Sequence, residues 1–167
     1  MIKTYKTHHP IIGKTSKIFE GAHVIGHVTI GEHVGVWFNA VIRGDMAEVT
    51  IGDRTNVQDQ VVIHTNKNLP THIGSDITIG HLACIHAATI KDGSLIGMGS
   101  IILDGAIVEE QAYVAAGTLV PPNKVVPAKT LVMGNPMKVV RALRDDELLS
   151  MKENALFYVN LINEYQG

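Results

Sequence analysis

Residues 73–90 read IGSDITIGHLACIHAATI, and isoleucine occupies positions 73, 79, 85 and 90. The first three of these isoleucines are six residues apart, and aliphatic residues keep this spacing through most of the chain. Small or β-branched residues usually stand four positions later, as Ala22, Ala83 and Ser100 do. The aliphatic positions are Ile12, Ile18, Val24, Ile30, Val36, Ile42, Ile51, Val57, Ile63, Ile73, Ile79, Ile85, Ile90, Ile96, Ile102, Val108, Val114 and Val120.

A six-residue period differs from the 3.6 residues of an α-helical turn, and self-similarity at a fixed period is typical of solenoids. A sandwich of short strands is disfavoured because it needs turn signals every 8–12 residues. With three hexads in each triangular coil, the eighteen hexads predict an all-β solenoid. It is a parallel β-helix of about six coils, stacked at the ~4.8 Å spacing of neighbouring strands.

The chain is expected to form one domain in three segments. The repeat occupies residues 1–125, because the aliphatic pattern ends at Pro121 and Pro122, and residues 126–144 connect it to a helix at 145–165. One face of this helix is apolar, which predicts that it packs on the solenoid. Leu148, Met151, Ala155, Val159 and Ile162 form that face.

Composition excludes several kinds of partner. The 167 residues carry a net charge of -2, which does not favour a nucleic acid, and the apolar runs are too short for a signal peptide or a membrane span. These features predict a cytoplasmic protein. Cys84 is the single cysteine, so one chain forms no disulfide and no thiolate cluster, and any metal must bind histidines or carboxylates.

The register of the hexads aligns two histidines. Ile42, Ile63 and Ile85 each begin the third side of a coil in three successive coils, so the residues that follow them form a column on one face: Arg43, His64 and His86. Imidazoles on adjacent coils, with backbones ~4.8 Å apart, can converge on one ion at the ~2.0–2.1 Å zinc–nitrogen distance.

His81 has a different register, two residues after Ile79 on the second side. Five residues of extended chain span about 16 Å, so His81 is not expected to share an ion with His86 of the same chain. In a homotrimer, His81 of one subunit can meet His64 and His86 of the next, which predicts three interfacial metal sites. The remaining histidines are expected to be solvated or hydrogen-bonded surface residues: His8, His9, His23, His27, His33 and His72.

The stretch RGDMAEVTIGDRTNVQD (43–59), His64 and GHLACIH (80–86) resemble the γ-class carbonic anhydrase family of the hexapeptide-repeat superfamily. The resemblance covers nearly the whole chain and implies a left-handed winding of the β-helix. It also implies that zinc, or iron or cobalt, is bound by His64 and His86 of one subunit and His81 of its neighbour. The implied activity is that of a lyase: a metal-bound hydroxide hydrates carbon dioxide reversibly to bicarbonate.

The same resemblance implies roles for the other candidate residues. Gln58 matches a residue that orients the metal-bound water, and Tyr158 matches an aromatic residue near the pocket, with a packing role as the alternative. Arg43, Asp45 and Asp59 match charged groups around the interfacial site, where an intersubunit ion pair is their alternative role.

Two departures from the family pattern concern proton removal, a step that needs an acid–base group within reach. Met46 stands where active members carry glutamate, and the loop NKNLPT (66–71) lacks their acidic residues. Weak or buffer-dependent hydration is therefore expected, with His72 as a candidate substitute. A coenzyme A-dependent acyltransferase with one histidine base and a metal-containing, non-catalytic scaffold remain alternatives.

Overall fold

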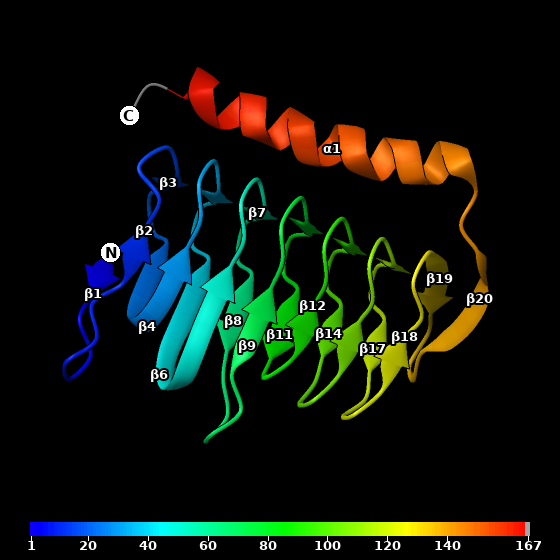
Figure 1. Ribbon diagram of the computed structural model, residues 1–167, viewed down its shortest axis with the longest axis horizontal. Helices are drawn as coiled ribbons and strands as arrows, with labels where there is room; N and C mark the ends of the chain where they lie inside the picture. Colours follow the sequence, from blue (N-terminus) through cyan, green and yellow to red (C-terminus); the bar gives the residue numbers. More distant parts are fainter. Residues whose placement is uncertain (166–167) are drawn as a thin grey trace.

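The computed structural model describes residues 1–165 as a triangular left-handed parallel β-helix, along which one helix lies (Figure 1). A twelve-stranded sheet forms two of its walls, and an eight-stranded sheet forms the third. The first sheet comprises β1 (Ile2–Lys3), β2 (Ile11–Ile12), β4 (His23–Ile30), β6 (Val41–Ile51), β8 (Val62–His64), β9 (Thr71–Ile73), β11 (Cys84–His86), β12 (Thr89–Ile90), β14 (Ile101–Ile102), β15 (Ile107–Val108), β17 (Leu119–Val120) and β18 (Val125–Val126). The second comprises β3 (Lys17–Ile18), β5 (Gly35–Val36), β7 (Asn56–Val57), β10 (Thr78–Ile79), β13 (Leu95–Ile96), β16 (Tyr113–Val114), β19 (Thr130–Met133) and β20 (Lys138–Ala142).

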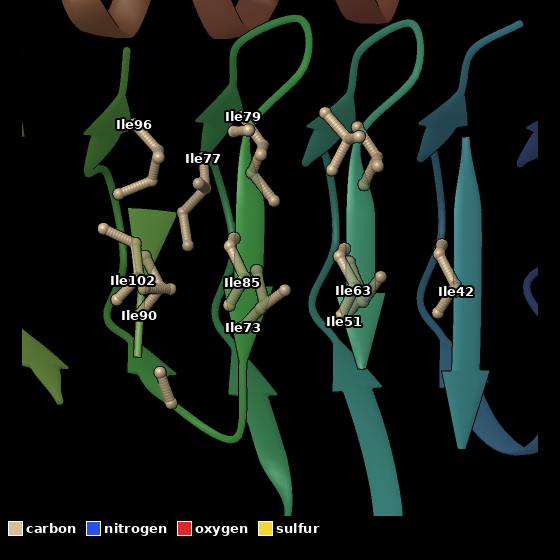
Figure 2. Close-up of a cluster of buried hydrophobic side chains, with 14 of the residues drawn as sticks. Ile42, Ile51, Ile63, Ile73, Ile77, Ile79, Ile85, Ile90, Ile96 and Ile102 are labelled. Atoms are coloured by element: carbon tan, nitrogen blue, oxygen red, sulfur yellow. The ribbon is translucent and has the colours of Figure 1, made fainter. Parts of the chain in front are cut away.

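The hexad aliphatics fill the interior in register. Ile42 is paired with Ile63, and Ile63 with Ile85, in parallel strands of successive coils, and all three side chains are fully buried. Figure 2 shows these isoleucines as ladders inside the solenoid. Ala83 is one of the small residues that share the interior, and it is also fully buried. The predicted solenoid and its inward-facing residues are confirmed.

Glycine after the aliphatic residue allows close approach between coils. A Cβ built on Gly80 would lie 2.7 Å from the backbone nitrogen of Met98 in the next coil, and one on Gly74 would lie 3.0 Å from that of Asp92. Real Cβ atoms do not come as close as the first distance, so position 80 requires glycine because the neighbouring backbone occupies the space.

The solenoid extends beyond the last hexad of the predicted repeat. Val126 of β18 and Val132 of β19 are fully buried, and both strands pair in parallel with strands of the preceding coil. They continue the six-residue spacing from Val120 and complete a seventh coil, one more than the six predicted. Pro121 and Pro122 lie at a corner between strands, where no ladder hydrogen bond is lost. The segment expected to be a connector therefore contributes Val126 and Val132 to the core.

The helix α1 (Asp145–Glu164) lies along the wall that contains β5, β7 and β10 (Figure 1). Met151, Ala155 and Ile162 are its buried residues, all three from the predicted apolar face, and the Thr78 hydroxyl donates to Asn154 Oδ1 at 2.9 Å. No helix among residues 1–165 combines the length and apolar character needed to cross a membrane.

We predict that Val126→Ala lowers the free energy of unfolding by about 2 kcal/mol, because two buried methyl groups are removed and a cavity is left. The neighbouring Val125 is 49% exposed and provides a matched control. Val125→Ala should change stability by less than about 0.5 kcal/mol. Chemical denaturation of both variants measures the difference, and equal effects would contradict a core that continues into the seventh coil.

Glu147 makes the start of α1 sensitive to acid. Hydrogen bonds from Arg141 and from the backbone N–H of Arg144 lower the pKa of Glu147 to about 2 from its ordinary 4.5. Its stabilising effect is therefore complete above pH 4.5 and is lost as the pH falls toward 2. We predict that Glu147→Gln lowers the melting temperature at pH 7 and that the gap from wild type closes between pH 4.5 and 2. Glu153→Gln, at an exposed position of the same helix, is the control, and its melting temperature should match that of wild type over the whole pH range.

Candidate metal centre

Two successive coils place His64 and His86 side by side at the ends of β8 and β11. The two residues are directly paired in the parallel ladder, and Arg43 is paired with His64 one coil earlier. The ring centroids are 5.2 Å apart, and His64 Nδ1 lies 3.3 Å from His86 Nε2. We call these two residues the histidine pair; the structure forms it where the hexad register predicts it.

A carboxylate holds the outer nitrogen of each ring. Asp45 Oδ1 lies 2.9 Å from His64 Nε2, and Asp104 Oδ1 lies 2.6 Å from His86 Nδ1. The second oxygen of Asp45 accepts a hydrogen bond from Arg43, and that of Asp104 accepts one from Asn66 Nδ2 at 2.6 Å. All four carboxylate oxygens therefore have partners, and both rings are fixed in orientation.

These contacts keep both carboxylates charged. Partial burial opposes ionisation of Asp45, but hydrogen bonds from His64 and Arg43 outweigh this effect and hold its pKa below the ordinary value. Hydrogen bonds from Asn66 and then from His86 lower the pKa of Asp104. A charged carboxylate accepts the ring N–H that faces it, which fixes the tautomer of each histidine.

The inner nitrogens of the histidine pair have the geometry of metal ligands. Each outer nitrogen donates its hydrogen to a carboxylate, so the inner nitrogens carry no hydrogen. The lone pairs of His64 Nδ1 and His86 Nε2 therefore point toward each other, and the two atoms are 3.3 Å apart. Two lone pairs at this distance repel unless a proton or a cation lies between them. Nitrogens bound at ~2.0–2.1 Å to one tetrahedral ion lie about 3.3–3.4 Å apart. The pair therefore fits two corners of a tetrahedral metal site.

His81 lies after β10, on the far side of a corner from the histidine pair. Its Nδ1 is 2.7 Å from Asp59 Oδ2, and its backbone N–H donates to Gln58 Oε1 at 3.1 Å. The Gln58 side chain is buried and also donates from Nε2 to Asn56 Oδ1 at 3.2 Å. Gln58 thus positions the backbone that carries His81.

Tyr158 joins this second group from α1. Its ring packs edge to face against Trp37, with the centroids 5.6 Å apart. Burial and the nearby Asp59 carboxylate raise the pKa of the Tyr158 phenol, whereas a hydrogen bond with Gln58 opposes the rise. Tyr158 therefore packs against an aromatic residue and also contacts the polar group around His81.

One chain carries two separate half-sites. The first contains the histidine pair with Arg43, Asp45 and Asp104; the second contains His81 with Gln58, Asp59 and Tyr158. Among residues 1–165, no group of three or more histidine, cysteine or acidic side chains converges on a common point where it could hold a metal ion. Within residues 1–165, His81 therefore lies apart from the histidine pair.

Three residues that support the half-sites were not predicted from the sequence: Asn56, Asn66 and Asp104. Asp104 could have been predicted from the hexad register. Ile102 pairs with Ile85 in the next coil, and Asp104 follows Ile102 by two positions. Asn66 and Asn56 have no comparable signal, since one lies in a loop and the other beside a core valine. His72, the candidate proton acceptor, bonds to Thr50 at 2.9 Å in the wall formed by β6 and β9.

Comparison with known proteins gives a consistent group of relatives. A Methanocaldococcus jannaschii protein named "Probable carbonic anhydrase" is 54% identical over 90% of this chain and 95% of its own length. A carbonic anhydrase of Geobacillus kaustophilus is 44% identical over 100% of this chain and 92% of its own. The mitochondrial gamma carbonic anhydrase 2 of Arabidopsis thaliana is 40% identical over 91% of this chain and 57% of its own.

A solved structure with the same fold is described as a transferase rather than an anhydrase. A crystal structure of a hexapeptide transferase family protein from Anaplasma phagocytophilum has a TM-score of 0.95 and 36% sequence identity, and the match covers 99% of this chain and 98% of the other. No family model matches the chain. The relatives therefore share this fold over its whole length, under both anhydrase and transferase descriptions.

Proposed function

Because the chain belongs to the γ-class carbonic anhydrase family, we propose that it is a metal-dependent carbonic anhydrase that converts carbon dioxide and water reversibly to bicarbonate and a proton. The observation that carries the proposal is the histidine pair, whose inner nitrogens face each other at 3.3 Å while carboxylates hold the outer ones. Without a cation, this arrangement leaves two lone pairs opposed.

His64 and His86 of one subunit and His81 of a neighbour would hold the ion, which is zinc, with iron or cobalt as alternatives. Three neutral imidazoles and one open position are typical of catalytic zinc. When bound, the ion supplies a Lewis acid that lowers the pKa of a coordinated water toward 7. The second half-site brings Gln58 and Tyr158 to the same interface, where they line the space beside the ligands.

The supporting residues act by orientation and charge. Asp45 and Asp104 fix the tautomers of the histidine pair and increase the basicity of the inner nitrogens. Arg43 neutralises the charge of Asp45 without contacting the ligands directly. Asp59 orients His81 in the same way, so each of the three imidazoles is held by its own carboxylate.

The surface between the half-sites supports a homotrimer. Val62, Cys84 and Ile101 form a column on adjacent coils, and large parts of Val62 and Ile101 are exposed in one chain. Leu82, directly after His81, is 61% exposed and has a φ of 63°, a conformation that costs free energy for a bulky residue. Burial of these side chains against a second copy would offset that cost.

Transferase activity is the second candidate, and one contact favours it. His81 is oriented by Asp59 at 2.7 Å, and a carboxylate-held imidazole at a subunit interface can act as a general base. The transferase description of a structure with the same fold is consistent with this reading. Such a role needs neither the histidine pair nor a metal, so metal-free protein distinguishes the two functions.

Mixed trimers test the shared site. His81→Ala alone and the double variant His64→Ala/His86→Ala alone should each bind no metal. Chains of both kinds, co-expressed with different affinity tags, should form trimers with one intact site, where the histidine pair of the first chain meets His81 of the second. We expect one ion per mixed trimer by elemental analysis. Metal in neither mixed trimer would rule out ligands from two subunits.

Hydration activity tests the reaction. Protein purified without added metal should contain about one ion per chain and should hydrate carbon dioxide in a stopped-flow assay. His64→Ala should lose both the ion and the activity, because two ligands from the remaining histidines give an incomplete site. His33→Ala, at an exposed corner, is the matched control and should keep both. Bound metal without hydration would indicate a scaffold, and acetyl-coenzyme A hydrolysis by metal-free protein would indicate a transferase.

A further inference from the structure

A small cavity lies beside the carboxylate that holds His64. Its volume is about 190 Å³, and Asp45, Met46, His8 and His27 are among the residues that line it. Asp45 therefore contacts the histidine pair on one side and this cavity on the other. At ~30 Å³ per water molecule, the cavity has room for roughly six waters.

Two of the lining residues are stacked imidazoles, His8 and His27. The rings of His8 and His27 are 4.4 Å apart with an interplanar angle of 14°, and His27 Nε2 lies 3.4 Å from Glu48 Oε1. The side chains of His27 and Glu48 are 45% and 38% exposed, so the imidazole pair reaches both the cavity and bulk solvent. This is the placement that a proton-transfer group requires.

We propose that the His8–His27 pair accepts the proton released by hydration, an inference that rests on the proposed carbonic anhydrase function. Carbon dioxide and water give bicarbonate and one proton. In the proposed route this proton passes along waters beside Asp45, which borders both the histidine pair and the cavity, to the lone pair of an imidazole nitrogen. The imidazolium then gives it to a buffer base at the surface, which restores the neutral ring. Asp45 does not take this role, because both of its oxygens already accept hydrogen bonds.

The charges around the imidazole pair suit transfer of one proton at a time. Glu48 faces His27 and stabilises an imidazolium there, and Asp45 lies across the cavity. Lys6 and Tyr5 line the same cavity, and Lys6 adds a positive charge to its lining. Two positively charged rings stacked 4.4 Å apart would repel each other, so the geometry favours transfer of a single proton through the pair.

This relay would add a role to two histidines and replace one candidate drawn from the sequence. His8 and His27 were expected to be ordinary surface residues, and His72 was the candidate substitute for the glutamate replaced by Met46. His72 instead bonds to Thr50 in the wall formed by β6 and β9. Strong dependence on external buffer is then expected only after the imidazole pair is removed.

The experiment compares the double variant His8→Gln/His27→Gln with His72→Gln and wild type, all loaded with zinc and checked for trimer mass and metal content. In dilute buffer, the double variant should lose at least about tenfold in kcat with kcat/KM unchanged, because general acid–base groups contribute factors of this size or more. A high concentration of imidazole buffer should restore kcat. His72→Gln should behave as wild type.

A readout independent of activity is an NMR titration of the ring protons in metal-free protein. His8→Gln should shift the titration midpoint of His27, and His27→Gln that of His8, whereas His72→Gln should move neither. Unchanged kcat in the double variant, loss of kcat in His72→Gln, or independent titration of the two rings would overturn the relay. Wild type that binds zinc but hydrates no carbon dioxide in any buffer would instead overturn the proposed function and the relay with it.

Discussion

The narrow interior of the solenoid is the constraint on which the rest of the structure depends. Each wall of each coil contributes one aliphatic side chain, and the coils stack so that these side chains pair in register, as Ile42, Ile63 and Ile85 do. A slip of one residue would bring polar side chains inside. Core packing therefore also fixes the position of the residue that follows each isoleucine. His64 and His86 follow Ile63 and Ile85, so the packing of the isoleucines aligns the two histidines.

Most of the fold and the alignment of the histidines could be predicted because both are consequences of that register. The seventh coil was missed because Pro121 and Pro122 resemble an end of the repeat, although valine returns at positions 126 and 132. The contacts of Asn66 and the stacking of His8 on His27 could not be predicted, since Asn66 and His8 lie in turns outside the hexads, where no period places them.

The wall geometry also explains why one chain holds only part of a site. Residues at one position of a wall stack from coil to coil, which brings His64 and His86 together. His81 follows β10 and is separated from them by a corner of the coil. Three ligands from one chain would need a third coil in the same column, and Arg43 and Leu103 occupy those positions. This column therefore supplies two histidines, and the proposed site needs its third from another chain.

Ligand positioning and proton transfer make opposite demands on a protein. A metal ligand must be held in one orientation, and the histidine pair meets this demand with two carboxylates that are themselves hydrogen-bonded. A proton acceptor must instead exchange with solvent, which suits the exposed rings of His8 and His27 better than any residue of a buried ladder. His8 comes from a turn before the first hexad and stacks on His27 of β4, so a residue outside the repeat and one within it form the pair together.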